Sequence, residues 1–250
     1  MIRVFADAEA LARGAAALFA EEAVRAVTAR GRASVLLAGG ETPRRTYEVL
    51  AEEPWRAAIP WEKIHFFWGD ERCVPADDPR SNQSLARESL LARVPVPPGH
   101  IHPIAGSDAP EQVAAAYQSE LERHFEGGPP RFDLVFLGLG ADGHTASLFP
   151  GSAVLAEGAR WTAVVHRPGE AFPRITLTLP LLNQARRVLF LVVGRDKAAI
   201  LAEIFQGNAP YPARLVRPSS GELIWFADRA ATDESVKDGY SPRNEERRNP

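Results

Sequence analysis

The chain has 250 residues, of which 45% are hydrophobic and 24% are charged, and its formal net charge at pH 7 is -3. This composition is typical of a globular protein and excludes a disordered or fibrous chain. Because no long run of Lys or Arg occurs, the sequence offers no basic surface for a nucleic-acid backbone or an anionic membrane, and we expect neither as a partner.

The cellular location follows from cysteine use and from the first residues. Cys73 is the only cysteine, so no intrachain disulfide can form, which favours a reducing compartment. Asp7 and Glu9 stand where a signal peptide would need an uninterrupted apolar core, and no apolar run is long enough to cross a membrane. We therefore expect a cytoplasmic protein, either a monomer or a small homo-oligomer.

The hydrophobic pattern predicts the order of the elements. Apolar residues recur at three- and four-residue steps over residues 7–30, which predicts an amphipathic helix that ends at Gly31. A short apolar run followed by glycine then occurs four times, at residues 34–38, 64–68, 133–137 and 188–193, with helical patterns such as 82–91 and 110–125 between them. This order predicts a doubly wound α/β fold, with a mostly parallel sheet and helices on both faces. Ligands of such sheets bind beyond the carboxyl ends of the strands.

Pro and Gly mark the connections. They concentrate at residues 95–99, 127–130 and 210–218, which we interpret as loops, and no change in composition marks a second domain. We expect a single α/β domain over residues 1–231. Residues 232–250 are polar and charged with little to bury, which predicts a mobile C-terminal tail.

The first candidate site segment is residues 36–43, which predicts a helix beginning at the end of a strand. Thr42 is a good N-cap, and Pro43 suits the first helical position. Gly39 and Gly40 let a ligand approach the backbone N–H groups, and such a helix end favours an anion, above all phosphate. A tight turn without a ligand gives the same pattern. The segment lacks the Lys-Ser/Thr pair of a P-loop, which disfavours a nucleoside triphosphate.

The second segment places three charged residues, Asp70, Glu71 and Arg72, directly after an apolar run. We expect them where the sheet opens to its ligand, and Arg72 can meet a carboxylate, a phosphate or a developing oxyanion in forked geometry. A solvated loop with local ion pairs is the alternative. Cys73 is more typical of a small buried residue than of a nucleophile.

The third segment, residues 132–150, is the most informative. Its glycines match the dinucleotide-binding pattern GxGxxG after a strand: Gly138, Gly140 and Gly143. The context argues against a nicotinamide cofactor, because a Pro-Gly pair at 150–151 cuts short the helix that should follow, and no acid about twenty residues on ends a further strand. The glycines instead predict a close approach to a small ligand and display Asp142 and His144, a histidine beside an acid.

Two further cations belong to the candidate site. Arg174 opens an alternating strand, and Lys197 falls in the first turn of a helix, where the helix dipole disfavours a cation and thereby suggests a partner anion. Metal chemistry has little support, because His100 and His102 lie two residues apart without a third ligand at a recognisable spacing. No HExxH or GxSxG motif occurs, and we expect neither a metal nor a cofactor.

Three blocks in this order resemble the 6-phosphogluconolactonase family, which is related to the glucosamine-6-phosphate deaminases and shares their sugar-phosphate isomerase fold. The blocks are Gly39-Gly40-x-Thr42-Pro43, then Asp70-Glu71-Arg72 with Ser81-Asn82, then residues 138–151 with the glycines, Asp142 and His144. Residues 174–178, Asp196-Lys197 and Trp225 extend the resemblance to nearly the whole chain. Glu41 departs from the family, whose members often carry Ser there, so backbone N–H groups and Thr42 are expected to make the phosphate contacts.

The resemblance implies hydrolysis of 6-phospho-D-glucono-1,5-lactone to 6-phospho-D-gluconate, the second step of the oxidative pentose phosphate pathway. Such a carbonyl needs an activated water, a place for the oxyanion and a proton for the leaving ring oxygen. We expect His144 to take the proton from water and to return one to that oxygen. Arg72 is expected to position substrate or stabilise charge, and Asp70 to orient Arg72 or a hydroxyl. The other predicted residues bind the substrate and its phosphate: Gly39, Gly40, Thr42, Asn82, Asp142, Gly143, Arg174 and Lys197.

Two other functions stay open at this level. A deaminase or isomerase of an amino-sugar phosphate would use Asp70 to move a proton between carbon atoms, although the block at residues 144–150 favours the lactonase. A non-catalytic sugar-phosphate sensor is the third possibility. Such sensors usually carry a DNA-binding segment, and none is visible before the first predicted strand.

Overall fold

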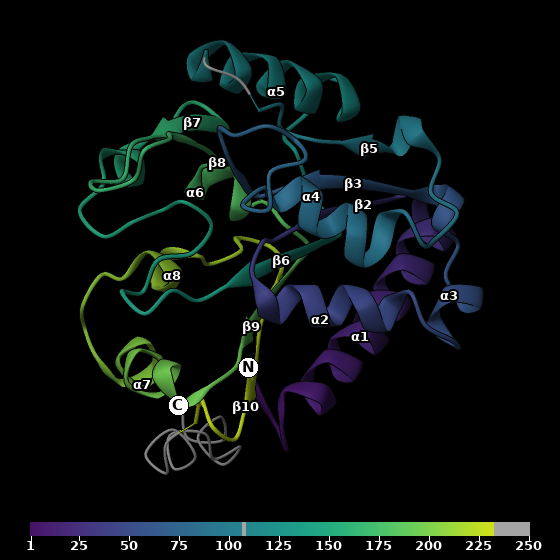
Figure 1. The fold of residues 1–250 in the computed structure, drawn as a ribbon, viewed down its shortest axis with the longest axis horizontal. Coiled ribbons are helices and arrows are strands. Elements are labelled where there is room, and N and C mark those ends of the chain that lie inside the picture. Colours follow the sequence, from purple (N-terminus) through teal and green to yellow (C-terminus); the bar gives the residue numbers. More distant parts are fainter. Residues whose placement is uncertain (107–108, 233–250) are drawn as a thin grey trace, which may run out of the picture.

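The structure, a computed structural model, describes residues 1–106 and 109–232. A seven-stranded sheet forms its centre, in the order β1-β10-β9-β6-β2-β3-β5, and every pairing in it is parallel (Figure 1). Its strands are β1 (Ile2–Phe5), β2 (Ala33–Leu37), β3 (Ile64–Trp68), β5 (Ile101–His102), β6 (Leu134–Gly138), β9 (Arg187–Val192) and β10 (Glu222–Asp228). The predicted doubly wound parallel sheet is confirmed, and all four predicted strands lie within one residue of their expected bounds.

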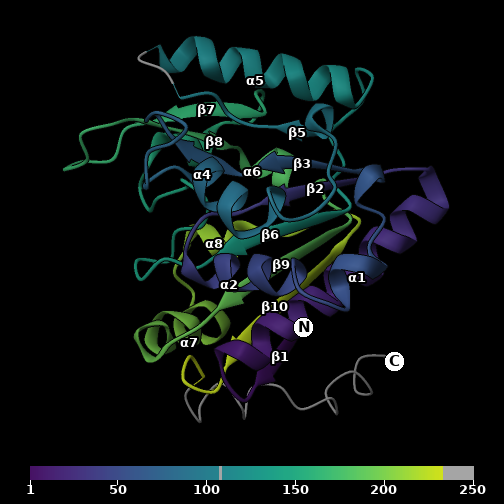
Figure 2. The same cartoon turned by 45° about the vertical axis from the view of Figure 1, so that its right-hand side comes forward.

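Helices cover both faces of this sheet (Figure 2). Successive residues of a strand point to opposite faces. In β3, Phe66 stacks on Phe19 of α1 with ring centroids 6.3 Å apart, whereas Phe67 contacts His124 of α5 at 4.8 Å. The helices α1 and α5 therefore lie on opposite faces. The helices are α1 (Ala8–Arg30), α2 (Glu41–Leu50), α3 (Trp55–Ala58), α4 (Asn82–Ala86), α5 (Pro110–His124), α6 (Leu179–Leu182), α7 (Ala198–Gln206) and α8 (Pro212–Leu215).

A second, antiparallel sheet of three strands was not predicted. Its order is β4-β8-β7, with β4 (Asp70–Arg72), β7 (Thr162–Val165) and β8 (Arg174–Leu177). Residues 70–72, for which a solvated loop was the alternative, form a short strand paired with β8. Arg174 opens β8 as predicted, and all four residues of this strand are buried among β4, β7 and α5. The two sheets meet at Gly69, which donates to the carbonyl of Leu37 and accepts from the N–H of Leu177.

The helix ends follow local chemistry, with one correction. The α1 helix starts at its N-cap Asp7, whose side chain accepts from the N–H of Ala10, and it ends as predicted at Gly31 with φ +76°. The α2 helix starts earlier than expected. Its N-cap is Gly40, at φ +103°, so Thr42 and Pro43 are already inside the first turn. The glycine permits this positive φ, which turns the chain into the helix before Thr42 is reached.

Short helical turns occupy two of the three predicted loops. Residues 98–100 form a 3₁₀ turn, and α8 lies within 210–218. Thr232, the first residue of the predicted tail, is buried, and its hydroxyl donates to the carbonyl of Arg229 at 3.2 Å. The rest of that tail, 233–250, lies outside the described residues. Within the described part of the chain, no helix is both long and apolar enough to cross a membrane.

Candidate active site

A cleft of about 350 Å³ lies at the carboxyl ends of β2, β6 and β9, where the segments after these strands meet β4 and the start of α2. It brings together nine of the predicted site residues: Gly39, Gly40, Thr42, Asp70, Arg72, Asn82, His144, Arg174 and Lys197. Asp142 and Gly143 do not line the cleft themselves, and they lie in the turn that carries His144. Segments from most of the chain length therefore converge on one place, as expected for parallel α/β sheets.

His144 is held by the acid two residues before it. Its Nδ1 is hydrogen-bonded to Oδ1 of Asp142, and the backbone N–H of His144 donates to the same oxygen at 3.2 Å. Partial burial by itself raises the pKa of Asp142, but these hydrogen bonds outweigh it and hold the pKa below its ordinary value. Because an ionised carboxylate only accepts hydrogen bonds, Nδ1 carries the proton. The Nε2 atom of the neutral ring is then a proton acceptor.

Glycines make room for this arrangement. A Cβ atom built on Gly140 would lie 2.0 Å from Nδ1 of His144 and 2.8 Å from Oδ1 of Asp142. Gly143 has φ +79°, and a Cβ there would lie 2.5 Å from the ring of Tyr211. The glycines of the GxGxxG pattern thus allow a tight turn and the close approach of side chains, and no helix follows them.

Asp70 lies at the buried edge of the cleft. It accepts from the hydroxyl of Ser147 at 2.6 Å and from Nδ2 of Asn82 at 3.2 Å, and its Oδ2 lies 3.8 Å from the guanidinium of Arg174. It makes no direct contact with Arg72. Arg72 instead donates to Oδ1 of Asn82 at 2.6 Å, so Asn82 links the two residues. A Cβ atom on Gly39 would collide with this Asn82 side chain at 1.8 Å.

Glu71 fixes the position of Asn82. Its carboxylate accepts from the N–H groups of Asn82 and Gln83, each at 2.8 Å, and from the hydroxyl of Ser81 at 3.0 Å. These are the free N–H groups at the start of α4, so Glu71 is its capping acid. Burial raises the pKa of Glu71 above its ordinary value, although the same backbone hydrogen bonds act in the opposite direction.

The cations of the cleft differ in how they are held. Arg174 is almost fully buried, and Glu170 holds it with two hydrogen bonds of 2.8 Å each, which keep the pKa of Glu170 low. Lys197 is partly exposed in a 3₁₀ turn that leads into α7, and its Nζ lies 3.1 Å from Oδ2 of Asp196. Arg174 is therefore held by more contacts than Lys197 is. Glu41 is exposed beside them and lies 3.7 Å from Arg44.

Several residues of the site were not singled out from the sequence. Glu170 precedes Arg174 by four residues. This spacing predicts a contact between side chains only in a helix, and the chain between them is not helical. Thr145 is 1% exposed, lines the cleft, and its hydroxyl has no hydrogen-bond partner within the described residues. An unpaired buried hydroxyl at a cleft is available to a ligand. Trp225, which extended the family resemblance, lies in the core and stacks on Phe190 at 3.8 Å.

The fold defines a doubly wound α/β protein, and its cleft combines an acid-held imidazole, several cations and a helix N-terminus. The chain belongs to the glucosamine-6-phosphate isomerase/6-phosphogluconolactonase family, whose model matches residues 6–225. The resemblance inferred from the sequence is thereby confirmed.

Known proteins similar to this chain carry the lactonase name. The 6-phosphogluconolactonase of Synechocystis sp. is 49% identical over 214 residues, which cover 83% of this chain and 86% of the relative. The structure of 6-phosphogluconolactonase from Trypanosoma brucei superimposes with a TM-score of 0.81 at 32% identity, covering 92% of this chain and 97% of that one. A monomeric glucosamine-6-phosphate deaminase also superimposes, with a TM-score of 0.77 at 20% identity over 92% of this chain and 98% of its own, and this likeness concerns the fold alone. The site residues must therefore distinguish the two activities.

Proposed function

We propose that this chain hydrolyses 6-phospho-D-glucono-1,5-lactone to 6-phospho-D-gluconate and that His144 is the general base. The family and its lactonase relatives support the reaction. One observation carries the assignment of the base: Asp142 accepts the Nδ1 hydrogen of His144 at the edge of the cleft, which leaves Nε2 as a proton acceptor. No metal or cofactor enters this proposal, since water is the only other reactant.

The proposed reaction moves one proton twice. Nε2 of His144 takes a proton from water as the water oxygen bonds to C1 of the lactone, and the carbonyl electron pair moves onto its oxygen. When the tetrahedral intermediate collapses, the bond between C1 and the ring oxygen breaks, and the imidazolium gives its proton to that ring oxygen. The negative Asp142 stabilises the imidazolium between the two steps. General acid–base help of this kind is typically worth about 10²–10⁴-fold in rate.

The other groups of the cleft have positioning roles in this proposal. Lys197, the start of α2 and the buried Arg174 form the phosphate end, because cations and free N–H groups favour an anion there. Arg72 is assigned to the oxyanion or to a substrate hydroxyl. Phosphate binding then places C1 next to His144, which converts the attack of water into a reaction within one complex.

The environment of Asp70 supports hydrolysis over deamination. A deaminase needs a carboxylate free to move a proton between carbon atoms. The two carboxylate oxygens of Asp70 are engaged, one by Ser147 and the other by Asn82, and the residue is buried. We therefore assign Asp70 to positioning Asn82 and, through it, Arg72.

The test is a lactone-opening assay with purified protein, measured against an enzyme-free control because the lactone also opens spontaneously. We expect wild-type protein to accelerate opening and His144→Ala to lower kcat by about 10²–10⁴-fold. His166→Ala is the matched control, since His166 is exposed and outside the cleft.

Two results would contradict the proposal. Ammonia release from glucosamine 6-phosphate without lactone opening would identify a deaminase. Binding of 6-phosphogluconate without any acceleration, in wild type and His144→Ala alike, would identify a sensor.

A further inference from the structure

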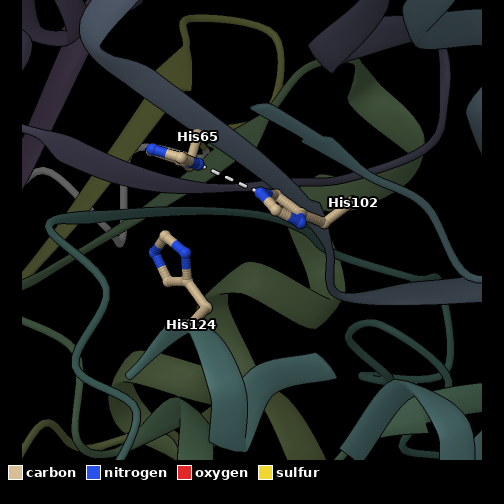
Figure 3. Close-up of side chains that lie close together, drawn as sticks. All are labelled: His65, His102 and His124. Atoms are coloured by element: carbon tan, nitrogen blue, oxygen red, sulfur yellow. Dashed lines mark hydrogen bonds between the residues drawn. The ribbon is translucent and has the colours of Figure 1, made fainter. Parts of the chain in front are cut away.

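Three histidines from distant parts of the sequence meet on the face of the main sheet that α5 covers (Figure 3). They are His65 of β3, His102 of β5 and His124 at the end of α5, and one nitrogen of each lies within 4.8 Å of the others. Nδ1 of His65 and Nε2 of His102 are 3.0 Å apart, and a nitrogen of His124 turns toward the pair (Figure 3). His65 is the second residue of β3, so the cluster is separate from the cleft at the carboxyl ends.

The outer nitrogens of two of these rings are held by oxygen atoms. Nδ1 of His102 is hydrogen-bonded to Oε1 of Glu120 at 2.8 Å, and Nε2 of His124 to the hydroxyl of Ser34 at 2.8 Å. This is the arrangement around metal-binding histidines, in which a carboxylate or another acceptor holds the far nitrogen and fixes the ring. The third ring, His65, is fixed by stacking on His100 at 3.9 Å.

Burial lowers the pKa of His65 to about 4 and that of His124 to about 3, and the neighbouring histidines and Arg32 add to this effect. A metal ligand must be an unprotonated nitrogen.

We propose that His65, His102 and His124 bind a divalent transition-metal ion of the zinc class, with water as the fourth ligand. Imidazole suits zinc and its neighbours, and three protein ligands with an open fourth position are a common zinc arrangement. Zinc–nitrogen bonds of about 2.0–2.1 Å in a tetrahedron put the nitrogens about 3.3 Å apart. The separation of 3.0 Å between His65 and His102 is already close to this, and the ligand nitrogen of His124 lies within 4.8 Å of the other two.

The hydrogen bonds of the three histidines indicate which hydrogen has to move when an ion binds. Because Glu120 accepts from Nδ1–H of His102, Nε2 of His102 is an acceptor and Nδ1 of His65 carries the hydrogen between them. The ion replaces that hydrogen, which moves to Nε2 of His65, so both facing nitrogens become ligands without a net loss of protons. The bound ion then ties β3, β5 and α5 together.

The cleft beside the histidine cluster and the charged residues around it affect whether a cation binds there. A neighbouring cleft of about 500 Å³ is lined by both His102 and Glu120, so one edge of the cluster faces it. Glu120, which is hydrogen-bonded to His102, favours a cation, although Arg123 is already paired with this carboxylate. Arg32, whose guanidinium donates to the carbonyl of His124 at 3.0 Å, opposes it. A neutral hydrogen-bonded stack without an ion is therefore the competing state that the experiment has to distinguish.

The experiment uses tag-free, full-length protein that has been treated with a chelator and dialysed. Zinc is titrated against a chromophoric competitor, and metal content is measured after gel filtration. We expect one zinc per chain and a rise in thermal midpoint of about 5–10 °C when free zinc is held at about 100 times Kd. Cobalt(II), used as a spectroscopic substitute, should give the intense visible absorption of a four-coordinate site in the wild-type protein.

Variants locate the ion. His124→Asn and His102→Asn should lose the bound zinc, whereas His166→Asn, which changes an exposed histidine, and His144→Asn, in the catalytic cleft, should keep it. Lactone opening by the chelator-treated wild type should be unchanged, so this test is independent of the proposed function. The absence of saturable one-to-one binding in wild type would overturn the proposal, as would equal zinc binding by wild type and His124→Asn.

Discussion

The imidazole of His144 and the carboxylate of Asp142 lie in one glycine-rich turn and are hydrogen-bonded to each other. They are two residues apart in sequence and share one tight turn, and Arg167 from a later segment lies 3.6 Å from Oδ2 of Asp142. The backbone N–H of His144 adds a second bond to the same carboxylate oxygen. The acid thus fixes both the tautomer and the direction of the ring.

Removing the charge of this acid should slow the reaction. We predict that Asp142→Asn lowers kcat by about 10–10²-fold with little change in KM, because an amide stabilises the imidazolium less and permits the wrong tautomer. Steady-state kinetics measure both constants. Asp77→Asn, at an exposed position, is the control, and an unchanged kcat for Asp142→Asn would refute the role of the acid.

A second prediction concerns the space for the imidazole. Gly140→Ala places a methyl group 2.0 Å from Nδ1 of His144, so the ring has to move away from Asp142. We expect a loss in kcat of at least about 10-fold, because small displacements of a catalytic group are costly. Gly158→Ala is the matched control, since a Cβ there meets no atom within 4 Å. Equal activity of the two variants would show that the close packing of Gly140 against the ring does not constrain His144.

The amino-acid pattern predicted the main sheet well, for a physical reason. Strands buried on both faces read as continuous apolar runs, and glycines after them mark their carboxyl ends. The small antiparallel sheet was missed because β4 consists of three charged residues, Asp70 to Arg72, whose burial depends on partners more than a hundred residues away. No local pattern reports such pairing.

The same reasoning explains the residues missed around the cleft and the histidine cluster. Residues at strand ends were found from position alone, since parallel strands converge there. Glu170 and Thr145 depend on how loops fold over the cleft, which sequence spacing does not encode. His65 and His124 are 59 residues apart and become neighbours of His102 only through the strand order β2-β3-β5 and the return of α5. Searching for close metal-ligand spacing could not reveal them.

A third prediction separates phosphate binding from chemistry. Lys197→Ala removes a cation assigned to the phosphate, so we expect kcat/KM for the phosphorylated lactone to fall by about 10–10²-fold, mainly through KM, as for the loss of one charged hydrogen bond. Opening of unphosphorylated glucono-1,5-lactone should change little. Lys63→Ala, at an exposed lysine remote from the cleft, is the control. A loss that is equal for both lactones would contradict the phosphate assignment.

A fourth prediction concerns two tyrosines whose hydroxyl groups hydrogen-bond to the backbone at the carboxyl ends of the neighbouring strands β2 and β3. The buried hydroxyl of Tyr47 accepts from the N–H and donates to the carbonyl of Ala38, and Tyr117 does the same for Trp68. Because phenylalanine leaves both backbone groups unpaired, Tyr47→Phe should lower the free energy of unfolding by about 2–3 kcal/mol. Chemical denaturation measures this change.

The control for the tyrosine prediction is Tyr211→Phe, whose lost hydroxyl has no hydrogen-bond partner within the described residues. Tyr47 also holds the residue directly before Gly39, so KM for the lactone should rise in Tyr47→Phe. Tyr117→Phe should lose similar stability with a smaller change in KM, since Trp68 does not line the cleft. Stability equal to wild type in Tyr47→Phe would show that solvent replaces the hydroxyl.

The last prediction concerns Cys73, which directly follows the charged residues of β4. Burial raises the pKa of Cys73 to about 11, and the nearby carboxylates of Glu71 and Glu111 act in the same direction. At pH 8 the thiolate fraction, and with it the alkylation rate by iodoacetamide, should be about 10²-fold below that of an ordinary cysteine. The rate should keep rising with pH up to about 11. Because this thiol is the only one in the chain, the urea-unfolded protein is its own control.

The raised pKa of Cys73 also determines how the stability of the folded chain changes with pH. The folded chain keeps the thiol proton to higher pH than the unfolded chain, so the contribution of Cys73 to stability is complete below about pH 9 and is lost as pH rises toward about 11. Cys73→Ser should lack this loss and should open the lactone with nearly wild-type kcat, since the proposed base is His144. Rapid alkylation of the folded protein at pH 7, together with loss of activity, would instead identify Cys73 as a reactive group of the site.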